Sequence, residues 1–65
     1  MYTIFKRKPW KREGGGYTPN PGARRTVIAH VETIEEAREY CARGPANQLL
    51  RAGDEYRDYC FYEFD

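Results

Sequence analysis

The sequence predicts a single small α+β domain with the order β-β-α-β, in which one helix packs on a mainly antiparallel three-stranded sheet. Three observations lead to this prediction. Two segments rich in β-branched and aromatic residues precede a well-capped helix signal, and a third strand-like segment closes the chain. The length of 65 residues fits one domain, residues 1–65, with a small interior.

The predicted strands come from short runs of aromatic and β-branched residues. The first strand is expected at Tyr2–Lys6, the second at Ala23–Glu32 and the last at Tyr56–Asp65. The first two are expected to form a hairpin with a long connection, a basic Gly/Pro-rich loop over residues 6–22. Loops of this length in compact domains are usually functional or disordered. The order of the strands stays open.

The segment TIEEAREYCARGP predicts the helix. Thr33 followed by Glu36 forms a capping box, and Gly44 is expected to supply a left-handed stop before Pro45. The inward stripe is expected to hold Ile34, Ala37 and Cys41, with Tyr40 at its edge. The next segment, Ala46–Gly53, is interpreted as one or two further helical turns that place Leu49 and Leu50 in the core.

Strand alternation then suggests a contact surface. The second strand puts Val27, Ala29 and Val31 on one face and Thr26, Ile28 and His30 on the other. Both faces are partly apolar, and one helix covers only one of them. We therefore expect the far face to be covered by the long loop, a second copy or a partner. The residues expected to make that contact are Ile28, His30, Tyr59 and Phe61.

The long loop holds the second candidate surface. Residues 1–25 carry seven basic and one acidic side chain, a balance of +6, whereas residues 26–65 carry four and nine, a balance of −5. Basic side chains around the only Trp could neutralise phosphates while the indole stacks on a base, or they could contact a protein or simply stay solvated. The candidate residues are Lys6, Arg7, Lys8, Trp10, Lys11, Arg12, Arg24 and Arg25.

No catalytic, metal or cofactor site is predicted. The chain contains no Ser, and its only His has no nucleophile that can be assigned to it. Gly14–Gly16 lack the Lys and Ser/Thr of a phosphate-binding loop and are interpreted as a flexible link. Cys41 and Cys60 are expected to be reduced thiols, with a disulfide as the alternative. Without a signal peptide or an apolar span, we expect a cytoplasmic protein that does not enter a membrane.

The helix segment TIEEAREYCA after an Arg-Arg strand and the closing YCFYEFD resemble short accessory proteins of tailed bacteriophages, most of them without assigned function. The resemblance covers roughly residues 23–65 and carries over no functional residue. It implies a non-enzymatic protein that acts by surface contact, such as an inhibitor of a host polymerase, nuclease or CRISPR complex, in the cytoplasm of the host.

Three functions are therefore expected in turn. The first is a non-enzymatic binding protein that contacts a host protein or protein–nucleic acid complex. The second is direct nucleic-acid binding through the basic loop with its Trp. The third is a structural homodimer formed through the outer face or an edge strand.

Overall fold

A computed structural model describes all residues, 1–65. Its elements are β1 (Tyr2–Arg7), β2 (Trp10–Glu13), β3 (Gly16–Pro19), β4 (Thr26–Val31), α1 (Ile34–Ala42), α2 (Pro45–Ala52) and β5 (Phe61–Phe64). The α+β class is confirmed. The single helix and single sheet were wrong in detail, because the chain has two helices and two antiparallel sheets.

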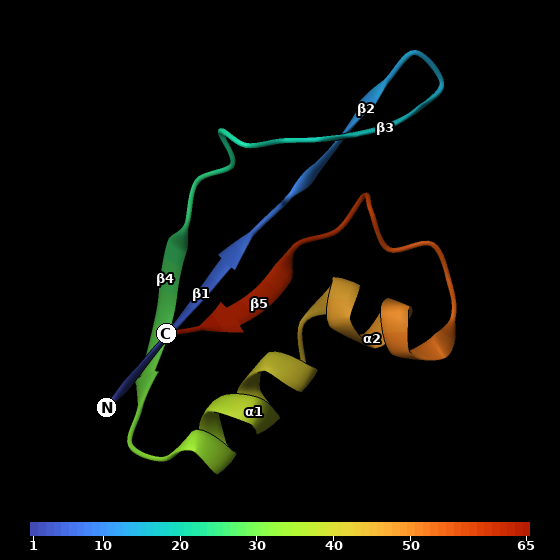
Figure 1. The fold of residues 1–65 in the computed structure, drawn as a ribbon. Helices are drawn as coiled ribbons and strands as arrows, with labels where there is room; N and C mark the ends of the chain where they lie inside the picture. The colour runs from blue at the N-terminus through green and yellow to red at the C-terminus, as the bar shows by residue number, and fades with distance from the viewer.

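The main sheet has the strand order β4-β1-β5, and β1 is antiparallel to both neighbours (Figure 1). The expected pairing of the first two long strands is confirmed as β1 with β4. β1 takes the centre because it holds two adjacent buried apolar residues, Ile4 and Phe5. A strand with one apolar residue toward each face is stabilised by neighbours on both edges.

A β-bulge between β1 and β4 changes the expected alternation of side chains. Ile4 lies opposite Ala29, but the next residue, Phe5, lies opposite Val27, which leaves Ile28 as the extra residue. Cross-strand partners share a face. Val27 and Ala29 therefore lie on opposite faces, and the prediction that they share one was wrong.

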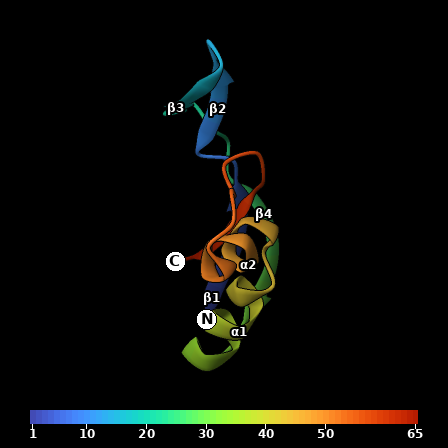
Figure 2. The same cartoon turned by 90° about the vertical axis from the view of Figure 1, so that its right-hand side faces the viewer.

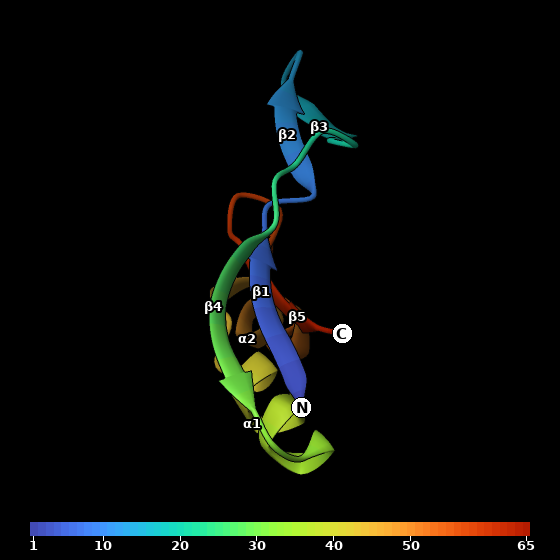
Figure 3. The same cartoon turned by 90° about the vertical axis from the view of Figure 1, so that its left-hand side faces the viewer.

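Both helices cover the same face of the main sheet, and the opposite face is left open (Figures 2 and 3). Cross-strand pairing puts Ile4, Tyr62 and Phe64 on the helix side. The ring of Tyr62 lies 6.2 Å from that of Tyr40 on α1. The buried residues are Ile4, Phe5, Ala37, Ala46 and Gly44. The expected core position of Leu50 was wrong, since it is 52% exposed at the outer side of α2.

The two helices meet at Gly44. The Thr33 side chain caps α1 by accepting a hydrogen bond from the Glu36 amide at 3.2 Å, as expected. Gly44, however, has φ −60° and ψ 138°, so the predicted left-handed stop was wrong. It is the N-cap of α2, and Pro45 begins that helix. Glycine is needed for space, because a Cβ there would meet Asn47 Oδ1 and lie 3.0 Å from Tyr62 Cγ.

The first turn of α2 is fastened to the outer edge of β5. The Asn47 Oδ1 atom accepts a hydrogen bond from the Tyr62 amide at 2.9 Å, and Asn47 Nδ2 donates to the Tyr62 carbonyl at 3.2 Å. The Ala46 amide donates to the Cys60 carbonyl at 3.1 Å. These bonds satisfy backbone groups that an edge strand leaves unpaired. The regular strand is Phe61–Phe64, shorter than the predicted Tyr56–Asp65.

Strands β2 and β3 form a hairpin that projects from one end of the main sheet (Figures 1 and 3). We call residues 10–19 the arm. Gly14 and Gly15 make its two-residue turn with φ 59° and 81°, the left-handed pair of angles that a type I′ turn requires. The interpretation of Gly14–Gly16 as a flexible link was wrong, because the glycines close an ordered turn and Gly16 begins β3.

No helix in the chain is both long and apolar enough to cross a membrane.

Candidate functional site

The arm is attached to the segment before β5 through one carboxylate. Arg12 and Tyr17 are cross-strand partners and share a face of the arm. Arg12 donates from Nε to Asp58 Oδ1 at 2.9 Å and from Nη2 to Oδ2 at 2.8 Å, and the Tyr17 hydroxyl donates to Oδ2 at 2.9 Å. A bidentate pair of this kind fixes orientation as well as distance. Asp58 thus sets how the arm lies on the rest of the protein.

These hydrogen bonds shift the ionisation of all three groups. The bonds from Arg12, and then the bond from Tyr17, hold the pKa of Asp58 well below its usual range. The bond to the Asp58 carboxylate raises the pKa of Tyr17, and the bond and charge of Asp58 raise the pKa of Arg12. The charged carboxylate and the neutral phenol are therefore the stable pair at neutral pH.

The residue before Asp58 adds a second attachment. The Arg57 guanidinium lies 5.4 Å from the ring centre of Trp10, 5.4 Å from that of Tyr17 and 5.8 Å from that of Tyr56. Its Nε is buried without a hydrogen bond and lies 3.7 Å from Glu55 Oε1. The aromatic faces attract this cation and hold the indole at the base of the arm.

Five of the predicted basic residues are not free cations or are only partly so. Lys11 lies 3.7 Å from Glu13, and Arg12 is bound by Asp58. Arg7 donates to Glu63 at 2.7 Å. Arg25 donates to Asp65 at 2.8 Å, and its guanidinium covers the Phe5 ring at 4.0 Å. The fifth residue, Trp10, brings no charge. Acidic partners from distant parts of the chain have thus neutralised much of the predicted basic surface.

The remaining cations gather in one hollow of about 220 Å³ at the base of the arm. Lys6, Lys8 and Arg24 line it together with Arg7, and these three form no salt bridge. The other lining residues are Asn20, Ala23, Thr26 and Cys60. Lys6 is paired with Thr26 at the end of the main sheet, where the chain leaves β1 and returns to β4. Arg24 comes in across this gap after a turn closed by the Ala23 amide and the Asn20 carbonyl at 3.1 Å.

A second hollow of about 320 Å³ adjoins the first. Its lining residues are Arg7, Pro9, Trp10, Pro19, Asn20 and Pro21. Trp10 faces its cross-strand partner Pro19, and the Asn20 amide donates to the Pro9 carbonyl at 2.7 Å, which extends the pairing of the arm by one step. Arg7 and Asn20 line both hollows. We call the two hollows together the arm-base groove: one half is basic and the other is made of proline and indole.

The open face of the sheet offers less apolar surface than expected. Its one large buried ring, Phe5, lies under Arg25, and the ion pair of Arg7 with Glu63 runs across its centre. The predicted contact residues of this face do not form one patch. His30 is exposed and lies 3.4 Å from Thr3 Oγ1, Ile28 is half-buried at the bulge, Phe61 packs edge-on against Tyr56 at 5.3 Å, and Tyr59 lies outside the strand and is 49% exposed.

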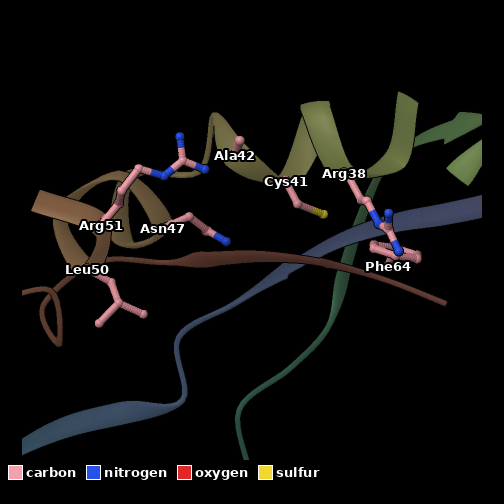
Figure 4. A pocket seen from close by; sticks show the side chains of 7 residues that line it. All are labelled: Arg38, Cys41, Ala42, Asn47, Leu50, Arg51 and Phe64. Atoms are coloured by element: carbon pink, nitrogen blue, oxygen red, sulfur yellow. The ribbon is translucent and has the colours of Figure 1, made fainter. Parts of the chain in front are cut away.

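A third hollow, of about 370 Å³, lies between α1, α2 and β5 (Figure 4). Its lining residues are Arg38, Cys41, Ala42, Asn47, Leu50, Arg51 and Phe64. Asn47 is already engaged with the backbone of β5, and Cys41 is a free thiol whose pKa is raised by burial and by the nearby Glu63 charge. Apart from Arg38 and Arg51, this hollow has no charged residue, and none of its residues was predicted as a contact.

Sequence reasoning found part of the arm-base groove and missed the rest. Lys6, Arg7, Lys8, Trp10 and Arg24 were predicted and do come together. The three prolines were interpreted only as loop punctuation, although prolines spaced on either side of the single Trp were a usable signal. Asp58 and Arg57 were assigned to solubility or left out, because nothing local to them points to the arm.

Side chains that could act as metal ligands do not cluster: nowhere do three or more His, Cys, Asp or Glu residues come together as a metal site requires. Cys60, in the floor of the basic hollow, is a free thiol like Cys41. No family model, curated protein or solved structure matches this chain.

Proposed function

We propose that this protein is a small, non-enzymatic binding protein that contacts nucleic acid through the arm-base groove. The observation that carries the proposal is the set of three cations without a carboxylate partner, Lys6, Lys8 and Arg24, beside a hollow of proline and indole. Phosphates are the common anions that such a cluster would neutralise, and the affinity for a nucleic acid comes largely from these contacts.

The surrounding charges support a locally positive surface. The two nearest carboxylates that face the groove region, Asp58 and Glu63, are paired with Arg12 and Arg7. The acidic residues of α1, Glu35 and Glu36, lie at the opposite end of the molecule from the arm (Figure 1). At physiological ionic strength charges are screened over about 8 Å, so these distant carboxylates have little effect on a phosphate at the groove.

The test is a salt titration of binding to fluorescently labelled oligonucleotides. We expect log K to fall linearly with log salt, and Lys8→Ala or Arg24→Ala to weaken binding and to reduce the magnitude of the slope by roughly 0.7 to 0.9 each. Lys11→Ala is the matched control, because Lys11 is equally basic but is paired with Glu13 on the arm. Absence of binding at low salt, or an equal loss in the control, would refute the proposal.

A second candidate is contact with a host protein, in line with the resemblance to phage accessory proteins. The observation that favours it is the free edge of β4, where Val27 is 56% exposed beside the half-buried Ile28. An uncovered edge strand pairs readily with another chain, including a second copy of this one. Light scattering at micromolar concentration distinguishes these outcomes: a dimeric mass that Val27→Lys abolishes indicates self-pairing, whereas a monomer refutes it.

A further inference from the structure

We infer that the arm-base groove binds a single strand, with one base against Trp10 in the proline and indole half and the adjoining phosphates in the basic half. This inference rests on the proposed function and adds the class of nucleic acid. It depends on the fact that the two hollows are continuous, since Arg7 and Asn20 line both. A strand that crosses from one to the other would meet flat apolar surface and free cations in succession.

The apolar half is suited to stacking and poorly suited to reading bases. Pro9, Pro19 and Pro21 supply half of its lining, and a proline has no backbone N–H to donate to a base edge. Asn20 and Arg7 are the only lining residues with polar side-chain groups suited to base edges, and Arg7 is held by Glu63. Every base has a π-face that stacks on an aromatic ring. We therefore expect a site that accepts different bases with little preference.

The indole is held in place before any ligand arrives. Trp10 is fixed on the arm by its pairing with Pro19 and contacts the Arg57 guanidinium at 5.4 Å. The arm itself is held by the bonds of Arg12 and Tyr17 to Asp58. A stacking surface whose position is already fixed loses less conformational entropy on binding. Arg57 and Asp58 thus act as positioning residues for the site.

A duplex fits the groove less well. Its bases are stacked inside the helix, so it would offer phosphates to the basic half and nothing to the proline and indole half. Insertion of the arm into a major groove, as two-stranded ribbons do, is disfavoured by the arm's outer surface. There Glu13 accepts a hydrogen bond from Thr18 at 3.2 Å and pairs with Lys11, which puts a carboxylate close to the tip.

Trp10 is the only tryptophan, so its fluorescence reports directly on the site. We would titrate the protein with a ten-residue oligothymidine, an abasic strand of equal length and a duplex hairpin, each at the same low salt. A stacked base is worth roughly 1–3 kcal/mol, which corresponds to about 5- to 150-fold tighter binding. We expect oligothymidine to quench Trp10 and to bind tighter than the abasic strand by a factor in that range.

Variants separate stacking from a change in the arm. Trp10→Ala should bring the affinity for oligothymidine down to that for the abasic strand, while Trp10→Phe, which keeps a ring, should retain part of the difference. Arg12→Lys weakens the attachment of the arm without removing the indole, and is the control for displacement of the arm.

The outcomes are distinct for the two proposals. Equal affinity for oligothymidine and the abasic strand, or equal affinity for the duplex, would overturn the single-strand inference and leave phosphate binding in place. Failure of all three ligands to bind would overturn the proposed function as well. Quenching that persists unchanged with the abasic strand would also refute base stacking on Trp10.

Discussion

The body of the protein and the arm are held together by different forces. In the body, Ile4, Phe5, Ala37 and Ala46 are buried, and the sheet and helices pack through apolar contact. In the arm, residues 10–19, no residue is buried, and its position depends on Asp58 and on the aromatic contacts of Arg57. The difference teaches that the arm can be altered or released without unfolding the domain, and that function can reside there at little cost to stability.

This contrast predicts that core substitutions destabilise the whole chain, whereas substitutions at the arm change only its attachment. The largest effect is expected for Ile4→Ala, because the side chain is fully buried at the centre of the sheet. Loss of buried apolar volume should lower the free energy of unfolding by roughly 2–5 kcal/mol, a large part of the stability of so small a domain. Urea unfolding followed by far-UV circular dichroism measures this. The control, Val27→Ala at a 56% exposed position, should cost under about 1 kcal/mol.

A smaller effect is expected for Gly44→Ala. The added Cβ would crowd Asn47 Oδ1 and Tyr62 Cγ, the groups that fasten α2 to β5. Overpacking of this kind typically costs about 1–3 kcal/mol. Thermal unfolding compares this variant with Gly22→Ala, where the nearest atom lies at 3.9 Å and φ is not positive. Equal stability of the two variants would show that the contact between α2 and β5 is loose.

Release of the arm is the third prediction. Asp58→Asn removes the charge that both Arg12 and Tyr17 bind, so amide hydrogens of the arm should exchange faster while those of β1 keep their protection. Native-state hydrogen exchange measures both in one experiment. Glu13→Gln, which alters only contacts within the arm, should leave exchange at its base unchanged. Faster exchange throughout β1 would contradict the separation of the two regions.

The smallest effect concerns pH. Because the pKa of Asp58 is lowered on folding, its contribution is present above its ordinary value of 3.8 and is lost only as the pH falls toward its lowered pKa. Because the pKa of Tyr17 is raised above 10.0, its contribution is complete below that pH and is lost as the pH rises through the raised pKa. The ring ¹³C shift of Tyr17 should titrate late, and in Asp58→Asn it should titrate closer to 10. An unchanged titration in that variant would exclude the hydrogen bond as the cause.

Signals confined to a few neighbouring residues were predicted well from sequence, and contacts across the chain were not. The helix start at Thr33 was found because its cap is formed within one turn. Pro45 was misinterpreted because a proline that ends one helix can also be the first residue of the next. The arm was missed because two glycines in a row are equally typical of a linker and of a tight turn, and only the pairing of flanking residues decides between them.

The candidate site divides in the same way. The cluster of basic residues and Trp10 was visible in the sequence, but which cations remain free depends on partners far along the chain. Arg12 is separated from Asp58 by 46 residues and Arg25 from Asp65 by 40, and no local pattern connects either pair. The free set of Lys6, Lys8 and Arg24 therefore follows from the three-dimensional fold.

The amide side chain of Asn47 has a consequence beyond the packing of α2. By bonding to both backbone groups of Tyr62, it imitates the neighbouring strand that β5 lacks. Further chains are thereby kept from adding to the sheet at that position, and growth into larger assemblies would have to start from β4. A single asparagine thus gives the sheet a direction in which it can polymerise and one in which it is blocked.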